Sequence, residues 1–255
     1  MVISNFDKIT HSSIGAQILS AKLIKDKNIF YNSPINEFGK TYRGGVPVIF
    51  PQFANNGNLK KHGFVRDIEW NLIYEVQDEE QVFIEYDCNI KAEDYPEWPY
   101  SAKLSLFCEM AGNSISIKLL VINTDIKPFA FTGGLHPYFA ISSREQIAIN
   151  GVEDISYSHS FPDIPFNLSG NSLIERLFES NKPVKFFNGD NWITLKSTGF
   201  DNWMIWNPGQ EGAACINDLP NEDHSKFICI EPIINSPKTL APGELFIGEL
   251  QIILD

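Results

Sequence analysis

Two histidines in this chain stand where a side chain could exchange protons with a bound molecule. His62 and His136 each lie where a glycine-flanked loop meets an aromatic segment, in K-K-H-G-F and G-G-L-H-P-Y-F. Imidazole is the side chain best suited to proton transfer near neutral pH. A structural role is the usual alternative for a lone histidine, but two in similar settings favour chemistry.

A carboxylate provides the complementary group. Glu231 lies in F-I-C-I-E-P-I-I, where its neighbours are almost all apolar. Burying a carboxylate is unfavourable unless it is paired or functional, and burial would raise its pKa toward the range of a working base. The alternative is an outward-facing residue at the end of a strand that Pro232 stops.

A basic window indicates an anionic ligand. Residues Phe38–Arg66 contain no acidic residue, although the chain has a formal net charge of −12. Crowded like charges are unfavourable unless an anion lies among them, so we expect a pocket for a small, phosphorylated ligand. The alternative is a solvated basic rim. The window carries Lys40, Arg43, Lys60, Lys61 and Arg66.

A segment rich in tryptophan indicates a sugar site. Residues Phe200–Gly209 read F-D-N-W-M-I-W-N-P-G. A flat aromatic face combined with polar groups such as Asp201 and Asn202 suits a sugar ring and its hydroxyls. A core strand followed by a turn is the alternative, with Trp206 simply part of the core.

Neither a metal nor a cofactor is expected. The sequence has no H-x-x-x-H, H-x-H or C-x-x-C spacing, and no cysteine is near His62 or His136 along the chain. We interpret the four cysteines as reduced core thiols, which is typical of a cytoplasmic protein. The remaining histidines lie in polar stretches and are predicted to be on the surface: His11, His159 and His224.

Composition narrows the function classes. With a pI near 4.9 the chain is a poor partner for nucleic acid or an anionic membrane. No apolar run approaches the length of a membrane span, and the N-terminus lacks the pattern of a secretory signal. We therefore expect a cytoplasmic protein, a monomer or weak homodimer, whose partner is a small molecule.

Short alternating segments predict an all-β fold. Period-two alternation runs through Val82–Tyr86, Lys103–Phe107, Ser114–Leu119 and Trp192–Lys196, with turn signals between strands. Only Ser172–Ser180 has helical spacing. No linker composition divides the chain, so residues 1–255 are predicted to form a single domain, a large antiparallel β-sandwich.

Together the motifs resemble the aldose 1-epimerase (mutarotase) superfamily, most closely its glucose-6-phosphate 1-epimerase branch. The matching segments follow the family's order across nearly the whole chain. They are R-G-G-V-P-V-I-F-P-Q-F at Arg43–Phe53, H-G-F-V-R at His62–Arg66, N-T-D-I-K-P-F-A-F-T-G-G-L-H-P-Y-F at Asn123–Phe139, W-N-P at Trp206–Pro208, C-I-E-P at Cys229–Pro232 and L-A-P-G-E at Leu240–Glu244. The resemblance implies the family's antiparallel supersandwich, in agreement with the periodicity.

The resemblance also implies roles for individual residues. His136 would be the general acid at the ring oxygen, and Glu231 the base at the anomeric hydroxyl. Expected contacts to the substrate come from His62, Gln52, Asp201 and Asn202, with phosphate contacts from Arg43, Arg66 and Lys61. The chain departs from the family in two places: Asn202 stands where an aspartate is common, and Gly209 where an aromatic often follows W-N-P.

The implied reaction is the interconversion of the α and β anomers of glucose 6-phosphate or a related hexose 6-phosphate. Ring opening needs one base and one acid that exchange roles on closure, with no metal or cofactor. Two alternatives stay open at this point: an aldose 1-epimerase for unphosphorylated sugars, and a carbohydrate-binding protein without turnover. The presence of both His136 and Glu231 argues against the second alternative.

Overall fold

The computed structural model describes residues 3–5, 8–24, 27–35, 37, 40–78, 81–152, 157–158 and 168–255. Strands dominate the described part of the chain, and the pairings between them are antiparallel, which confirms the predicted fold class. The helical segments are short: η1 (Val65–Asp67), α1 (Gly209–Ala214) and η2 (Asn221–Ser225). None of the described helices is long and apolar enough to cross a membrane.

One layer is an eight-stranded sheet in the order β12-β15-β16-β19-β9-β8-β7-β6. In β9 and β19 every second residue is buried, because one face of the sheet lies against the core. All four segments with predicted period-two alternation are strands of this sheet. Its strands are β6 (Asn71–Gln77), β7 (Gln81–Ile90), β8 (Ala102–Ala111), β9 (Ser114–Asn123), β12 (Ala148–Asn150), β15 (Val184–Phe187), β16 (Trp192–Thr198) and β19 (Leu245–Leu254).

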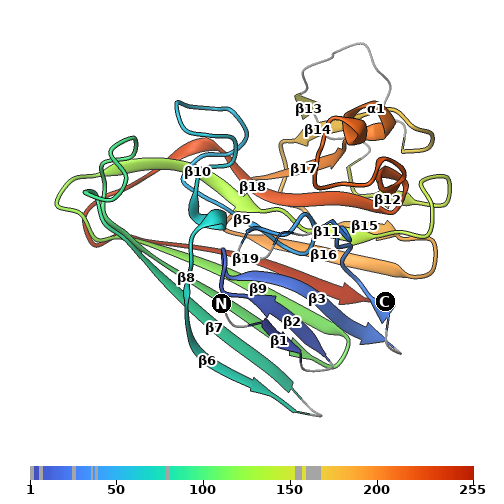
Figure 1. The fold of residues 1–255 in the computed structure, drawn as a ribbon, viewed down its shortest axis with the longest axis horizontal. Coiled ribbons are helices and arrows are strands. Elements are labelled where there is room, and N and C mark those ends of the chain that lie inside the picture. The colour runs from blue at the N-terminus through green and yellow to red at the C-terminus, as the bar shows by residue number, and fades with distance from the viewer. Residues whose placement is uncertain are drawn as a thin grey trace.

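The second layer is a seven-stranded sheet in the order β13-β14-β17-β18-β10-β5, with β11 also paired to β18. Figure 1 shows this sheet along the top of the molecule and the eight-stranded sheet below it. Its strands are β5 (Val48–Ile49), β10 (Phe129–Leu135), β11 (Tyr138–Ala140), β13 (Tyr157–Ser158), β14 (Ile174–Phe178), β17 (Asn202–Asn207) and β18 (Phe227–Leu240).

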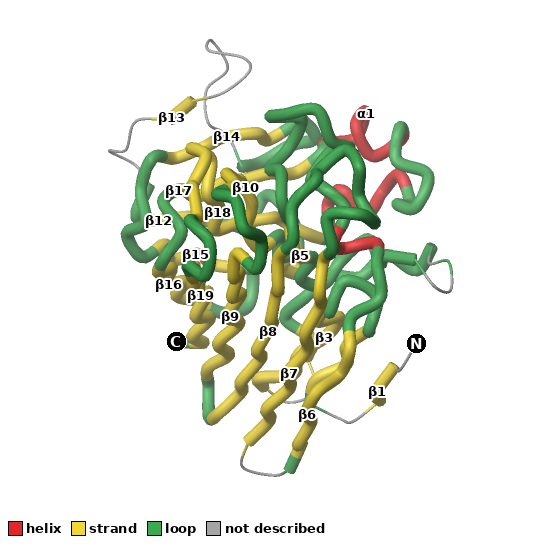
Figure 2. The backbone as a smooth tube through the Cα atoms, turned by 90° about the vertical axis from the view of Figure 1, so that its left-hand side faces the viewer, coloured by secondary structure: helices red, strands yellow, loops and turns green. Residues whose placement is uncertain are grey.

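The predicted helix at Ser172–Ser180 is wrong. The segment forms β14, which pairs with β17 over five residues from Ile174↔Asn207 to Phe178↔Trp203. Its apolar residues fit a helical period as well as a strand, and pairing with a long neighbouring strand outweighs that local pattern. In Figure 2 the helical segments, in red, are confined to one side of the molecule beyond the sheets.

A buried histidine connects a smaller sheet, β1-β2-β3-β4, to the eight-stranded sheet. His11 of β2 is fully buried, with Nδ1 2.6 Å from the Tyr86 hydroxyl and Nε2 3.3 Å from Glu75. His224 is buried as well, so the surface prediction is wrong for both, while His159 lies outside the described residues. The strands are β1 (Ile3–Asn5), β2 (Ile9–Ser12), β3 (Gln17–Ile24) and β4 (Lys27–Asn28).

The main core fills the space between the two large sheets. Phe131 of β10 contacts Phe246 of β19 at a ring distance of 5.5 Å, and Phe139 of β11 contacts Phe186 of β15 at 4.9 Å. The four cysteines are free thiols, three of them buried, whereas Cys215 is exposed and departs from the prediction of core thiols.

The two faces of β18 have different neighbours. Ile228 and Ile230 belong to the main core, whereas Cys229 and Ile233 belong to smaller apolar clusters on the opposite side. Glu231 has the same parity as Cys229 and Ile233, so its side chain leaves the core on the outer face of the seven-stranded sheet. Loops and α1 cover that face.

Two glycines let β10 fit between its neighbours. A Cβ on Gly133 would lie 2.3 Å from the Ile49 carbonyl oxygen, and one on Gly134 would lie 2.4 Å from the Pro232 carbonyl oxygen. Both contacts are with backbone, which cannot rotate away. Gly133 therefore allows the close approach of β10 to β5, and Gly134 allows its close approach to β18 beside Glu231.

We predict that Gly134→Ala destabilises the protein by roughly 1–3 kcal/mol, because β18 must move to admit the methyl group. Denaturant unfolding followed by circular dichroism measures the loss. Gly112→Asn is the control: Gly112 has φ +57° and no neighbour within 4 Å, and asparagine tolerates this conformation. Equal stability of Gly134→Ala and wild type would contradict the close-approach argument.

Candidate active site

Strand register assembles one wall of the site. Trp206 of β17 lies opposite Glu175 of β14 on one side and Cys229 of β18 on the other, and Cys229 lies opposite Tyr138 of β11. Directly paired residues in an antiparallel sheet point to the same face. These four side chains therefore form a row across the outer face of the seven-stranded sheet.

A second row runs beside the first. Leu177, Met204 and Glu231 are paired across β14, β17 and β18, two residues along from the first row. His136 lies two residues before Tyr138, in the turn between β10 and β11, and its backbone N–H donates to the Pro47 carbonyl at 2.9 Å. The turn and the register together bring His136 to Glu231.

His136 and Glu231 form a buried pair. His136 Nε2 lies 3.4 Å from Glu231 Oε1, and the two residues are 5% and 1% exposed. The other polar atoms, His136 Nδ1 and Glu231 Oε2, have no hydrogen-bond partner. Glu231 is therefore buried and is not the solvent-facing residue of the alternative interpretation. Each group keeps a polar atom that could bond to a ligand.

The surroundings disfavour charge on both members of the pair. Burial raises the pKa of Glu231 well above its ordinary value, an effect that nearby Glu175 increases and Lys61 opposes. Burial also lowers the pKa of His136 well below its ordinary value, and the neighbouring His62, Arg66 and Arg43 lower it further. Both shifts favour the neutral forms, a protonated Glu231 carboxyl and an unprotonated His136 ring.

Aromatic rings fix the orientation of His136. Its ring stacks on Tyr138 with 4.7 Å between centroids and an interplanar angle of 11°. Trp206 meets the same ring edge-on at 5.8 Å, and His62 meets it edge-on at 5.4 Å. Trp206 is half-buried and borders the cavity, so it is not simply a core residue.

His62 is held in an unusual backbone conformation. Its φ is +68°, a value rare for residues other than glycine, and the following Gly63 has φ +71°. Its Nδ1 accepts a hydrogen bond from the Ala54 N–H at 3.3 Å. Burial, with help from Arg66 and Lys61, lowers the pKa of His62 to about 3, so the ring is neutral. Positive-φ strain at a buried polar residue is typical of a functional site.

Gln52 organises the same loop instead of lining the cavity. Its Nε2 donates to the carbonyls of Ala54 and Leu59, both at 3.1 Å, and its Oε1 accepts from the Leu59 N–H at 3.0 Å. Both ends of the amide are therefore bonded to backbone. Gln52 shapes the turn that carries His62.

Three cations of the basic window meet at the cavity: Arg43, Lys61 and Arg66. Arg43 Nε donates to Asp218 at 3.1 Å, and its Nη1 donates to the Tyr138 hydroxyl at 3.2 Å. Arg66 Nη2 donates to the Lys61 carbonyl at 3.3 Å, while its buried Nε has no partner. The other two lysines are paired in solvent, Lys40 with Glu37 and Lys60 with Asp67.

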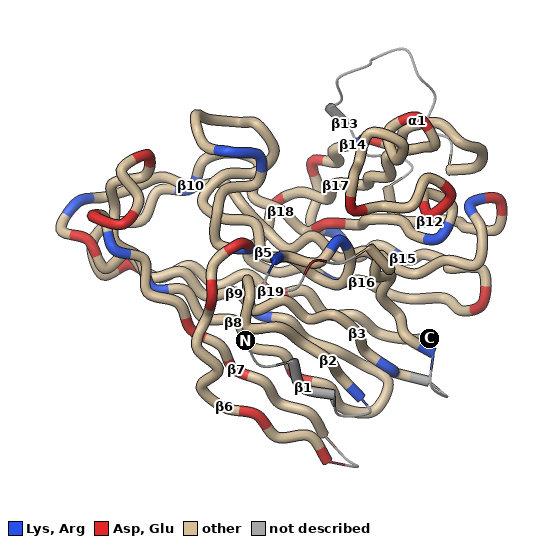
Figure 3. Tube along the Cα trace, viewed as in Figure 1, with Lys and Arg blue, Asp and Glu red and all other residues tan. Residues whose placement is uncertain are grey.

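The cavity has a volume of about 230 Å³, and a neighbouring hollow of about 380 Å³ shares Arg43, Arg66 and Tyr138 with it. The cavity wall carries both basic and acidic groups. Lys and Arg, in blue, mark the loop after β5 in Figure 3, whereas acidic segments surround α1. A ligand in the cavity would meet the cations Arg43, Lys61 and Arg66 and the carboxylates Glu175 and Glu231.

The structure places Asp201 and Asn202 outside the cavity wall. Asp201 Oδ1 accepts a hydrogen bond from the Asn235 N–H at 3.3 Å. Asn202 Nδ2 donates to the Phe178 carbonyl at 3.4 Å. Asn202 pairs with Ile233, one row beyond Glu231, so these contacts position strand ends.

Sequence reasoning missed Glu175, Tyr138 and Cys229. Glu175 lies in the segment predicted as a helix. Had that segment been predicted as a strand paired with the W-N-P strand, Glu175 would have been recognised as a candidate. Tyr138 follows His136 at strand spacing in H-P-Y-F, which was the available signal. Cys229 is distant from His136 along the chain, and only the β11–β18 pairing brings them together.

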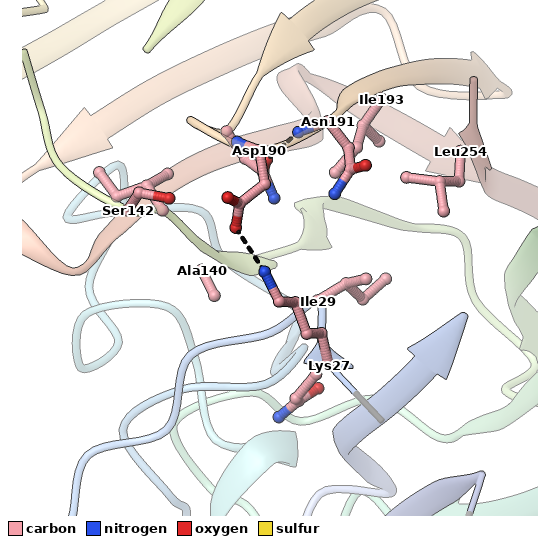
Figure 4. A pocket seen from close by; sticks show the side chains of 11 residues that line it. Lys27, Ile29, Ala140, Ser142, Asp190, Asn191, Ile193 and Leu254 are labelled. Atoms are coloured by element: carbon pink, nitrogen blue, oxygen red, sulfur yellow. Dashed lines mark hydrogen bonds and ion pairs between the residues drawn. The ribbon is translucent and has the colours of Figure 1, made fainter. Parts of the chain in front are cut away.

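A larger hollow of about 600 Å³ lies elsewhere, beside β4 and the start of β16. Figure 4 shows Ile29, Ile193 and Leu254 around it and one ion pair, Lys27 Nζ to Asp190 Oδ2 at 3.1 Å. Both members of the pair are exposed, and the described residues that line this hollow include no histidine, cysteine or glutamate. His62, His136 and Glu231 all line the smaller cavity.

Comparison with known proteins points to one family. The family model described as "Aldose 1-epimerase" matches residues 3–252. The chain is 26% identical to a Cenchrus ciliaris protein named "Putative glucose-6-phosphate 1-epimerase", over 93% of this chain and 78% of that protein. An Escherichia coli protein of the same name is 24% identical, over 85% and 76%.

Solved structures agree on the fold. The crystal structure of a "putative mutarotase" from Salmonella typhimurium has a TM-score of 0.86 at 20% identity, covering 99% of this chain and 89% of that one. A galactose mutarotase related enzyme from Lactobacillus acidophilus has a TM-score of 0.74 at 16% identity, covering 100% and 97%. The expected supersandwich is confirmed.

We predict that the Glu231 carboxyl titrates above its ordinary pKa in the free protein. Carbon-13 NMR of glutamate labelled at the side-chain carboxyl measures it directly. Glu175→Gln should lower this pKa, because it removes a negative charge that raises it. Glu179→Gln is the control, an exposed glutamate just beyond β14. A Glu231 carboxyl that titrates in the ordinary range would contradict the burial argument.

Proposed function

The chain belongs to the aldose 1-epimerase family of isomerases, and we propose that it interconverts the α and β anomers of a hexose 6-phosphate such as glucose 6-phosphate. The observation that carries the phosphate assignment is the cluster of Arg43, Lys61 and Arg66 beside the buried pair of His136 and Glu231. Relatives with glucose-6-phosphate 1-epimerase names support the same assignment.

The proposed reaction begins with proton removal from the anomeric hydroxyl by Glu231, while His136 protonates the ring oxygen. The C1–O5 bond then breaks to give the open aldehyde, and rotation about C1–C2 lets the ring close on the other face with the roles exchanged. Both oxygens are bonded to C1, so acid and base must lie close together, as the 3.4 Å separation allows.

The phosphate would also prepare the acid. Arg66 and Arg43 are two of the groups that lower the pKa of His136. A phosphate bound between them would offset their charge, and the pKa of His136 would rise in the complex. This favours transfer of the shared proton from Glu231 to His136, which is the protonation state that the proposed step requires.

The remaining roles concern binding. Trp206 and Met204 offer an apolar face to the sugar ring, and Glu175 and His62 offer hydrogen bonds to its hydroxyls. Asp218 and Tyr138 hold the Arg43 side chain in place. Asp201, Asn202 and Gln52 would act on the substrate only through the backbone that they position.

NMR exchange spectroscopy of glucose 6-phosphate and glucose tests the reaction. We expect the protein to accelerate exchange of the 6-phosphate far more than exchange of glucose. Glu231→Gln should slow it by about 10²–10⁴-fold with little change in substrate affinity, because one proton-transfer group is lost. Glu179→Gln should match the wild type. Acceleration of glucose alone would favour the unphosphorylated alternative, and binding without acceleration would favour the non-catalytic one.

A separate prediction concerns the phosphate. Arg43→Ala should raise KM for the 6-phosphate by about 10- to 150-fold, equivalent to one charge-assisted hydrogen bond, and change any activity on glucose far less. Lys40→Ala is the matched control, since Lys40 is an exposed cation of the same window paired with Glu37. If activity on both substrates falls equally, Arg43 is structural and the phosphate assignment fails.

A further inference from the structure

Strand pairing places a thiol beside the acid–base pair. Cys229 and Glu231 are two residues apart on β18 and share a face, and Cys229 is paired with Tyr138, two residues after His136. One ligand atom from each of Cys229, His136 and Glu231 lies within 4.8 Å of the other two. No cysteine is near His136 along the sequence, but the fold places Cys229 beside it.

All three groups are buried and two retain an unused atom. Cys229 is 0%, His136 5% and Glu231 1% exposed. His136 Nδ1 and Glu231 Oε2 lack hydrogen-bond partners. His136 and Glu231 line the cavity, so an ion that enters it meets an imidazole and a carboxylate first, with the thiol next to them.

We propose that Cys229, His136 and Glu231 form a binding site for a thiophilic divalent cation such as Zn²⁺ or Cd²⁺, and that an ion bound there inhibits the enzyme. Sulfur, imidazole nitrogen and carboxylate oxygen are the donor types that Zn²⁺ takes in proteins. The ion would occupy the atoms that exchange protons with the sugar. It is an inhibitor of the proposed reaction and has no part in its chemistry.

The geometry suits a tetrahedral ion after a small closure. Ligand atoms at about 2.0–2.3 Å from Zn²⁺ in a tetrahedron lie roughly 3.3–3.8 Å apart. The His136 to Glu231 separation of 3.4 Å already falls in this range. The upper bound of 4.8 Å on the three separations leaves a closure of about 1 Å for the side chains to make on binding. The fourth position faces the cavity and would hold water.

The charges around the site determine how tightly it should bind the ion. Binding removes the thiol proton and any proton on Glu231, so two negative charges meet the ion. The nearby cations Arg43, Lys61 and Arg66 oppose it. We therefore expect the affinity for Zn²⁺ to be weaker than that of a structural zinc site.

Two readouts on the whole protein test the site. Zinc chloride is titrated into the anomer-exchange assay, and cadmium chloride is titrated while the thiolate-to-cadmium charge-transfer absorption is recorded. The absorption needs no turnover, so it tests metal binding even if the proposed reaction is wrong. We expect inhibition that EDTA reverses and an absorption band that saturates at one Cd²⁺ per chain.

Cys229→Ala and Cys215→Ala form the matched pair, because Cys215 is the exposed thiol. Cys229→Ala should lose the band and need more Zn²⁺ for inhibition, by at least the roughly 10–100-fold that losing even an outer-shell partner costs. Cys215→Ala should behave as wild type. Cys229→Ser replaces Cys229→Ala if a melting curve shows that the alanine variant is unfolded.

The proposal is overturned by any of three results. These are a wild-type protein with no cadmium band, a Cys229 variant that keeps both the band and the zinc sensitivity, and loss of the band in Cys215→Ala instead. If Cys229 variants lose the band but keep the full zinc inhibition, the inhibitory ion binds elsewhere, and the inhibition part of the proposal fails.

Discussion

The pairing of β18 with β17 and β11 is the constraint on which the site depends. Its register aligns Glu231 with Met204 and Cys229 with both Trp206 and Tyr138. A slip of one residue would turn Glu231 into the core between the sheets and Ile230 into the cavity. The glycines of β10 and the buried face of β18 hold this register, so the fold and the chemistry share one set of contacts.

The electrostatics of the site follow from the same arrangement. Burial opposes charge on His136 and Glu231, while three cations stand at the edge of the cavity. Under the proposed function, an anionic ligand would offset the charge of the cations and raise the pKa of His136. A neutral ligand would do neither. We therefore propose that ligand binding and proton transfer are coupled through the same arginines.

Much of this could be predicted from the sequence, and most of the failures have one physical origin. Period-two alternation located the strands of the eight-stranded sheet, and local motifs singled out His136, Glu231, Arg43 and Arg66. Long-range strand pairing has no local signature. It made a strand of the segment around Glu175, buried His11 beside Tyr86 and brought Cys229 to His136. Gln52 and His224 were misjudged for a different reason, because both side chains hydrogen-bond to backbone close to them along the chain.

The dependence of anomer exchange on pH tests the central claim most directly, because the pair works only with one proton. With chemistry rate-limiting, kcat/KM for glucose 6-phosphate should show a bell-shaped dependence on pH. The acid limb, where the pair gains a second proton, should lie below the ordinary pKa of histidine for the free enzyme. The alkaline limb, where the last proton leaves, should lie above the ordinary pKa of glutamate. Both apparent values belong to the pair. A rate that stays constant from about pH 3 to 10 would contradict a shared proton between His136 and Glu231.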